Sequence, residues 1–124
     1  MLATAPFTPL LGTLKPEAAK AFYADVLGLK FINDDGFALV FEGKNGRIRV
    51  SRVPAVTPPA YAVLAFNVDN IDAAVDGLTA KGVAFVRYPF FVQDPKGIWS
   101  APDGTKVAWF HDPDLNLLSL VQAA

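Results

Sequence analysis

The chain has 124 residues, of which 52% are apolar and 19% are charged, and it contains no cysteine. A chain of this length fits one compact domain, and it can bury roughly two thirds of its unfolded surface without a disulfide or a structural metal. The absence of cysteine excludes disulfide frameworks, thiolate zinc sites and cysteine nucleophiles. Eleven lysines and arginines against twelve acidic residues give a formal net charge of -1, so nucleic acid is not an expected partner.

No segment predicts a membrane span or a secretion signal. The longest unbroken apolar run covers residues 60–66, far short of the roughly 20 residues that cross a bilayer. The first residues have neither the cationic region nor the sustained apolar region of a signal peptide. We therefore expect a cytoplasmic protein without a membrane partner.

In chain order, the first half predicts a strand, a helix and three further strands. An apolar strand is expected at 7–14, and Pro16 then begins a helix that runs to about Leu27. Gly28 stands where a left-handed cap ends a helix. Clear turn signals separate the remaining strands, which are expected at 29–32, 37–41 and 47–53.

The second half predicts the same order of elements after a proline-rich linker at 54–60. A strand is expected at 61–68, and a helix capped by Asp69 or Asn70 then ends at Gly82. The last three strands are expected at 84–88, 105–111 and 117–122.

An internal repeat supports this division. The segment Gly28-Leu29-Lys30-Phe31-Ile32 matches Gly82-Val83-Ala84-Phe85-Val86 in character, at an offset of 54 residues. The sequence therefore predicts one α+β domain of two βαβββ modules, at about 5–54 and 61–122, whose cupped mixed sheets carry their helices on the outer face.

Four segments carry a family resemblance. They read AFYADVLGL at 21–29, FNVDNID at 66–72, APDGT at 101–105 and FHDPDLN at 110–116. In order and spacing they resemble the vicinal oxygen chelate superfamily, which includes glyoxalase I, extradiol dioxygenases and bleomycin-binding proteins. The resemblance implies modules that curl into half-open cups and pair to enclose one site. Leu115 departs from the family pattern, which has a glycine there, and this bears on the local turn.

The resemblance also implies where a metal would bind. In metal-dependent relatives, histidine and carboxylate ligands on the first and last strands of each module hold a divalent cation. The matching positions fall on Thr8, on Arg49 or Ser51, on Val63 and on Ser119. None of these side chains can offset the lost hydration of a divalent ion. We therefore expect no metal and no cofactor, and no role in catalysis for the only histidine, His111.

The alternation of side chains along strands predicts the lining of the cup. The candidate ligand-binding residues on the strands are Thr8, Arg49, Ser51, Tyr61, Val63 and Ser119. Trp99 and Trp109 join them, because the long connection 89–104 could close over the cup as a lid. Its aromatic residues could instead pack on the neighbouring module or on a second subunit. The face that Trp109 occupies is left open, and Arg47 and Arg49 could simply be solubilising charges.

A guanidinium group in such a cup needs a hydrogen-bonding or ion-pair partner. Arg49 and Tyr61 between apolar walls suit a flat apolar molecule with an anionic group. Otherwise water or a nearby carboxylate, such as Glu42, must pair with Arg49.

These features favour a metal-free small-molecule binding protein of the glyoxalase/bleomycin resistance type that holds an aromatic or amphipathic ligand. The alternative is a lyase, isomerase or dioxygenase-like enzyme of the same superfamily, with or without a metal. No paired nucleophile and base is visible, so no catalytic residue is assigned. A third hypothesis is that the protein is an interaction subunit whose cup is filled by its own core side chains and binds no ligand. A homodimer is expected, because half-open cups leave strand edges uncovered.

Overall fold

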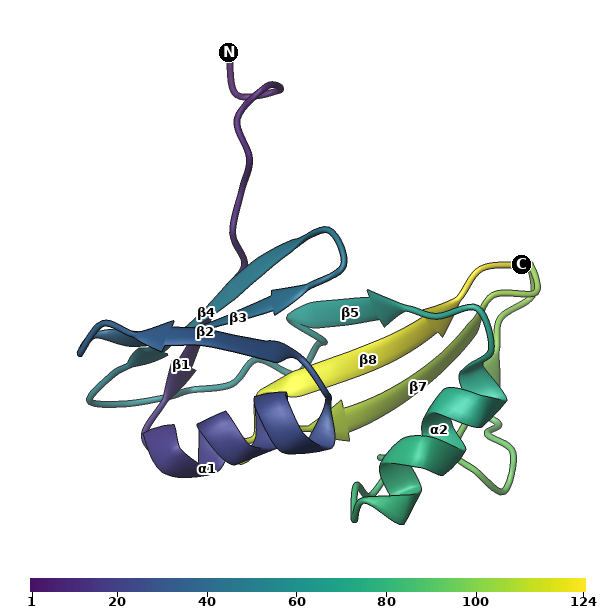
Figure 1. The fold of residues 1–124 in the computed structure, drawn as a ribbon. Coiled ribbons are helices and arrows are strands. Elements are labelled where there is room, and N and C mark those ends of the chain that lie inside the picture. Colours follow the sequence, from purple (N-terminus) through teal and green to yellow (C-terminus); the bar gives the residue numbers. More distant parts are fainter. The chain divides into compact units, whose positions relative to one another are not determined.

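The computed structural model describes residues 1–124, and the chain divides into two compact units, Met1–Thr57 and Pro58–Ala124. Each unit contains one four-stranded mixed sheet and one helical segment (Figure 1). The predicted α+β class is therefore confirmed. No helix has the length and hydropathy that crossing a bilayer requires.

The first unit builds its sheet in the order β1-β4-β3-β2. β1 lies parallel to β4, and the other neighbours are antiparallel. The predicted helix continues past its first turns as a π-helical segment, and Gly28 follows it with a φ of 77°. The elements are β1 (Leu10–Thr13), α1 (Pro16–Lys20), η1 (Ala21–Val26), β2 (Lys30–Asp34), β3 (Ala38–Gly43) and β4 (Gly46–Arg52).

One face of the first sheet packs against the helical segment. Tyr23 is fully buried, and its ring lies 5.4 Å from that of Phe41 on β3. Ile48 and Val50 on β4 are also buried. Burying a side chain of this size contributes about 1.5–3 kcal/mol. The alternation of β4 then directs Arg47 and Arg49 to the opposite face, as predicted.

The second unit builds its sheet in the order β5-β8-β7-β6. Asn70 caps its helix, because the side-chain oxygen accepts a hydrogen bond from the N–H of Ala73. The N–H of Ile71 donates to Oε1 of Gln122, 2.8 Å away, which ties the start of the helix to β8. The elements are β5 (Leu64–Asn67), α2 (Ile71–Ala80), β6 (Trp99–Ser100), β7 (Lys106–His111) and β8 (Leu117–Gln122).

The strand predicted at 84–88 is wrong, because this segment forms no regular strand and β6 completes the sheet instead. The side chain of Gln93 explains the difference. Its amide nitrogen donates to the carbonyl of Val86, and its amide oxygen accepts from the N–H of Tyr88. The side chain thereby satisfies backbone groups that a strand partner would otherwise satisfy.

Several predicted strand ends also shift. β1 begins at Leu10 rather than at residue 7, and β5 begins at Leu64 rather than at residue 61. β2 runs on to Asp34, with an irregular register between Phe31 and Asn33. This extension places the turn between β2 and β3 later than the sequence suggests.

Candidate functional site

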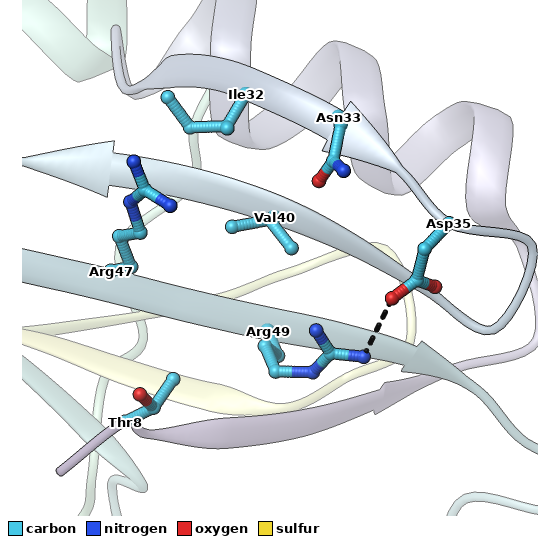
Figure 2. Close-up of a pocket in the computed structure, with 7 residues that line it drawn as sticks. All are labelled: Thr8, Ile32, Asn33, Asp35, Val40, Arg47 and Arg49. Atoms are coloured by element: carbon cyan, nitrogen blue, oxygen red, sulfur yellow. Dashed lines mark hydrogen bonds and ion pairs between the residues drawn. The ribbon is translucent and has the colours of Figure 1, made fainter.

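A hollow of about 320 Å³ lies on the face of the first sheet that carries Arg47 and Arg49 (Figure 2). Both arginines extend from β4, and the apolar side chains of Ile32 and Val40 lie between the polar groups. Its lining residues are Thr8, Ile32, Asn33, Asp35, Val40, Arg47 and Arg49. We call it the arginine hollow. Five of the seven lining residues are polar or charged, so the hollow offers convergent polar groups of the kind that orient a ligand.

Arg49 forms an ion pair inside the arginine hollow. Its Nη2 lies 3.1 Å from Oδ2 of Asp35. The other oxygen of Asp35 accepts hydrogen bonds from the N–H groups of Ala38 and Phe37, at 2.8 and 2.9 Å. These backbone bonds, followed by the Arg49 guanidinium, lower the pKa of Asp35. Asp35 therefore places a fixed negative charge beside Arg49.

The sequence offered Glu42 as a carboxylate that could pair with Arg49, but Arg49 pairs with Asp35. Glu42 pairs with Arg47 instead, with 2.9 Å between Nε of Arg47 and Oε2 of Glu42. Asp35 reads as a turn residue in the sequence, and only the register of β2, β3 and β4 brings it to Arg49. Asn33, Ile32 and Val40 were likewise not predicted to line the site. The alternation of β3 could have pointed to Val40, but the irregular register between Phe31 and Asn33 brings both Ile32 and Asn33 to the hollow, which alternation does not predict.

The preceding aspartate holds a different arginine. Asp34 accepts two hydrogen bonds from Arg52, both 2.6 Å long, in a bidentate pair. This pair and the N–H of Gly36 lower the pKa of Asp34 to about 2. Asp34 lies opposite the buried Leu39 in the sheet register. Consecutive aspartates therefore engage arginines on opposite faces of the first sheet.

The second unit carries an aromatic cluster in the corresponding place, formed by Tyr88, Phe90, Phe91, Trp99 and Trp109. The rings of Phe91 and Trp109 are stacked, with centroids 5.1 Å apart and planes at 3°. The ring centroid of Phe91 also lies 4.5 Å from that of Trp99, and the ring centroid of Tyr88 lies 5.3 Å from that of Trp109. Burial raises the pKa of the Tyr88 hydroxyl. The aromatic residues of the connection 89–104 therefore pack on one another and on β7 of their own unit.

The register of β7 and β8 settles which face Trp109 occupies. Trp109 lies opposite Ser119, and the buried Phe110 lies opposite Leu118. Gln122 has the same parity as Leu118 and bonds to the start of α2. Trp109 and Ser119 consequently point away from α2.

The structure brings together some of the predicted ligand-binding residues. Thr8 and Arg49 line the arginine hollow, and Ser51 lies on the same face of β4 outside it. Trp99 and Trp109 belong to the aromatic cluster, and Ser119 is buried across the strand from Trp109.

Two predicted residues lie outside both groups. Val63 precedes β5, and its N–H donates to the carbonyl of Leu117. Tyr61 is 68% exposed, and it belongs to neither the hollow nor the cluster.

The residues at the positions that the resemblance assigns to a metal do not fit one. Thr8, Ser51, Val63 and Ser119 offer no anionic or imidazole ligand, and Arg49 adds a positive charge. Across residues 1–124, no three histidine, aspartate or glutamate side chains converge as a metal site would require.

Asp112 organises the turn between β7 and β8. The buried carboxylate of Asp112 accepts hydrogen bonds from the N–H of Asp114 and from the N–H and side chain of Asn116. Leu115 adopts a φ of 67° in the left-handed region. The backbone thus keeps a conformation suited to glycine although the residue is leucine.

Comparisons with known proteins agree with this architecture. The sequence model of the Glyoxalase/Bleomycin resistance protein/Dioxygenase superfamily matches residues 9–120. No curated protein matches significantly.

Solved structures share the fold at low sequence identity. A member of the same superfamily from Sphaerobacter thermophilus has a TM-score of 0.76 and 20% identity, covering 98% of this chain and 99% of that one. A bleomycin resistance determinant encoded on the transposon Tn5 has a TM-score of 0.74 and 20% identity, covering 97% and 98%. Lactoylglutathione lyase from Agrobacterium tumefaciens has a TM-score of 0.73 and 16% identity, covering 96% and 93%. Such identities establish the fold alone.

Proposed function

Because the chain belongs to the Glyoxalase/Bleomycin resistance protein/Dioxygenase superfamily, we propose that it is a small-molecule binding protein of this fold that works without a metal ion. Its ligand is an organic anion with an aromatic or apolar body. The observation that carries the proposal is the arginine hollow, which is lined by the guanidinium groups of Arg47 and Arg49. Arg49 stands at a position that the resemblance assigns to a metal ligand.

The chemistry of the hollow supports an anionic ligand. A guanidinium has five N–H donors in a planar fork that matches a carboxylate. Arg49 donates to Asp35 and Arg47 donates to Glu42, so each retains donors for a ligand. The amide of Asn33 and the hydroxyl of Thr8 add neutral hydrogen-bonding groups. Charge-assisted hydrogen bonds of this kind are among the strongest that a protein makes.

The apolar part of the ligand has its support within the first unit, because Ile32 and Val40 line the hollow itself. Flat ring systems present broad apolar faces to such side chains. A monocarboxylate on a flat ring system is therefore the proposed ligand class.

Calorimetric titration of chelator-treated protein tests this proposal. We expect 2-naphthoate to bind and 2-naphthylmethylamine, which has the opposite charge, to bind far more weakly. Arg49→Ala should weaken naphthoate binding by about tenfold or more, since hydrogen bonds to charged groups contribute roughly 1.5–3 kcal/mol. Arg52→Ala is the matched control, because Arg52 pairs with Asp34 away from the hollow. Equal binding of both compounds, or naphthoate affinity that Arg49→Ala leaves unchanged, would contradict the proposal.

Thermal unfolding tests the metal-free part separately. A ligand of the native state at 100 times its dissociation constant adds roughly 2.7 kcal/mol to stability. We expect the melting temperature to be the same with chelator and with added nickel, manganese, iron or zinc. A clear rise with one ion bound per chain would overturn this part.

We also propose that the protein is a homodimer. Each sheet ends in edge strands, β1 and β2 in the first unit and β5 and β6 in the second, and strand edges are commonly covered by a second subunit. Sedimentation at micromolar concentration should give about twice the chain mass of 13.3 kDa. A single species of the chain mass would contradict the dimer.

A further inference from the structure

The carboxylate of Asp35 lies inside the arginine hollow, next to the guanidinium that the proposed ligand needs. We propose that Asp35 is an internal competitor for Arg49 and sets the charge selectivity of the hollow, so that it accepts a monocarboxylate and disfavours a dianion. This inference rests on the proposed function, because it concerns the same hollow.

The position of Asp35 does not depend on Arg49 alone. Its Oδ1 is held by the N–H groups of Phe37 and Ala38 in the turn, while its Oδ2 faces Nη2 of Arg49 (Figure 2). The turn therefore fixes the carboxylate in place before any ligand arrives. An exposed ion pair usually loses much of its strength to side-chain entropy, and this anchoring reduces that loss on the aspartate side.

The charges that line the hollow define the ligand it accepts. Arg47 and Arg49 line the hollow, and each is already paired with one carboxylate, Arg47 with Glu42 and Arg49 with Asp35. A single ligand carboxylate can bind by taking the free N–H donors of these arginines and by competing with Asp35 for Arg49. A second carboxylate on the ligand would lie near Asp35 without a further cation, and like charges at such distances repel.

The neighbouring residue provides a matched control. Asp34 is the last residue of β2, directly before Asp35, and it also pairs with an arginine, Arg52. It does not line the hollow, because its register partner is Leu39 on the buried face. Asp34→Asn and Asp35→Asn therefore remove the same charge from adjacent positions on opposite faces of the sheet.

The experiment measures three ligands against the wild type, Asp35→Asn and Asp34→Asn by calorimetry. The probes are 2-naphthoate, neutral 2-naphthamide and naphthalene-2,3-dicarboxylate. Asparagine keeps a side-chain carbonyl for the N–H groups of Phe37 and Ala38, so the turn should survive, and circular dichroism will check the fold.

We expect Asp35→Asn to tighten naphthoate binding about five- to tenfold, as the loss of one nearby negative charge predicts. The dicarboxylate should gain more than naphthoate, and the amide should not change. Asp34→Asn should alter naphthoate affinity less than about twofold, since solvent and salt screen exposed charges. In an Arg49→Ala background, the gain from Asp35→Asn should disappear.

The outcomes separate this inference from the proposed function. If naphthoate binds the wild type and Asp35→Asn equally well, the inference is wrong and the proposed function stands. An equal gain from Asp34→Asn, or an equal gain for the amide, would also overturn it, because neither depends on a local competing charge. If no variant binds naphthoate, both are overturned. Binding that is detected only with Asp35→Asn supports the inference.

Discussion

The two units of this protein share an order of elements and differ on the sheet face that points away from the helix. In the first unit that face carries Arg47 and Arg49, with Asp35 beside them. In the second unit it carries Trp109, on which Phe91 is stacked. The helix-side faces of both units carry the buried apolar core, and the first also holds the part-exposed pair of Asp34 and Arg52. The repeat thus preserves the face that packs on the helix, while the opposite face carries different chemistry in each unit.

The difference begins just after the helices. In the first unit β2 completes the sheet, and the turn after it brings Asp34 and Asp35 to β4. In the second unit the corresponding segment 84–88 is held by Gln93, and the ring of Phe91, which follows it, stacks on Trp109 of β7. The presence of a regular strand in one unit and an irregular segment in the other thus accounts for the ion pairs on the first face and the aromatic rings on the second.

The largest difference in stability is expected between a phenylalanine on the helix side of the second sheet and one on the opposite face. Phe110 is fully buried on the helix side of its sheet, so Phe110→Ala should lower the free energy of unfolding by about 3–5 kcal/mol. Phe91 is half-buried on the other face, and Phe91→Ala should cost only about 1–2 kcal/mol. Urea unfolding measures both values. Equal losses would show that the aromatic cluster is part of the core rather than a free face.

The turns that join the last two strands of each unit should also respond differently. Asp112 is buried and accepts three hydrogen bonds in the second unit. Asp112→Ala should therefore cost about 2–3 kcal/mol, because it leaves buried donors unsatisfied. Asn45 in the turn of the first unit is exposed, and Asn45→Ala should change stability by less than about 0.5 kcal/mol. A large loss for Asn45→Ala, measured by the same unfolding assay, would contradict this contrast.

Acid should weaken the first unit through Asp34. The folded pKa of Asp34 is about 2, below its ordinary value of 3.8. A depressed pKa means that the stabilisation is fully present above 3.8 and is lost as the pH falls toward 2. We expect the unfolding midpoint of the wild type to fall more steeply over this range than that of Asp34→Asn. Parallel pH profiles for the two proteins would show that the pair with Arg52 contributes nothing.

The smallest expected effect concerns the turn that departs from the family pattern. Leu115 has a φ of 67° and is exposed, and a side chain in this region carries a steric cost of about 1–2 kcal/mol. Glycine removes that cost but gives the unfolded chain more freedom. Leu115→Gly should therefore raise the free energy of unfolding by up to about 1 kcal/mol. A loss of stability in thermal unfolding would mean that the Leu115 side chain has a packing role.

Local and periodic features of the sequence predicted most of the fold. Gly28 and Gly82 mark the helix ends because both have positive φ values. The alternation around Arg49 assigned its face correctly, since Ile48 and Val50 are buried. The segment 84–88 was predicted wrongly because it keeps one bond to β7, from the N–H of Val86 to the carbonyl of Trp109, while the Gln93 side chain takes the carbonyl of Val86 and the N–H of Tyr88.

The candidate site was less accessible to sequence reasoning. Arg49 and Thr8 were predicted, and both line the hollow. Asp35 was missed because its contact with Arg49 joins residues far apart in the chain, and it depends on the length of β2 and on the register of three strands. A turn motif such as Asn-Asp-Asp-Gly predicts the turn, and it carries no information about which arginine the turn will meet.

We propose that the face with the ion pairs holds an anion without a metal. Nitrogen-15 NMR of the arginine Nε–H groups can follow this while 2-naphthoate is titrated into chelator-treated protein. The signals of Arg47 and Arg49 should shift until saturation, while that of Arg52, paired with Asp34, should stay in place. An unmoved Arg49 signal, with shifts confined to the indoles of Trp99 and Trp109, would contradict it.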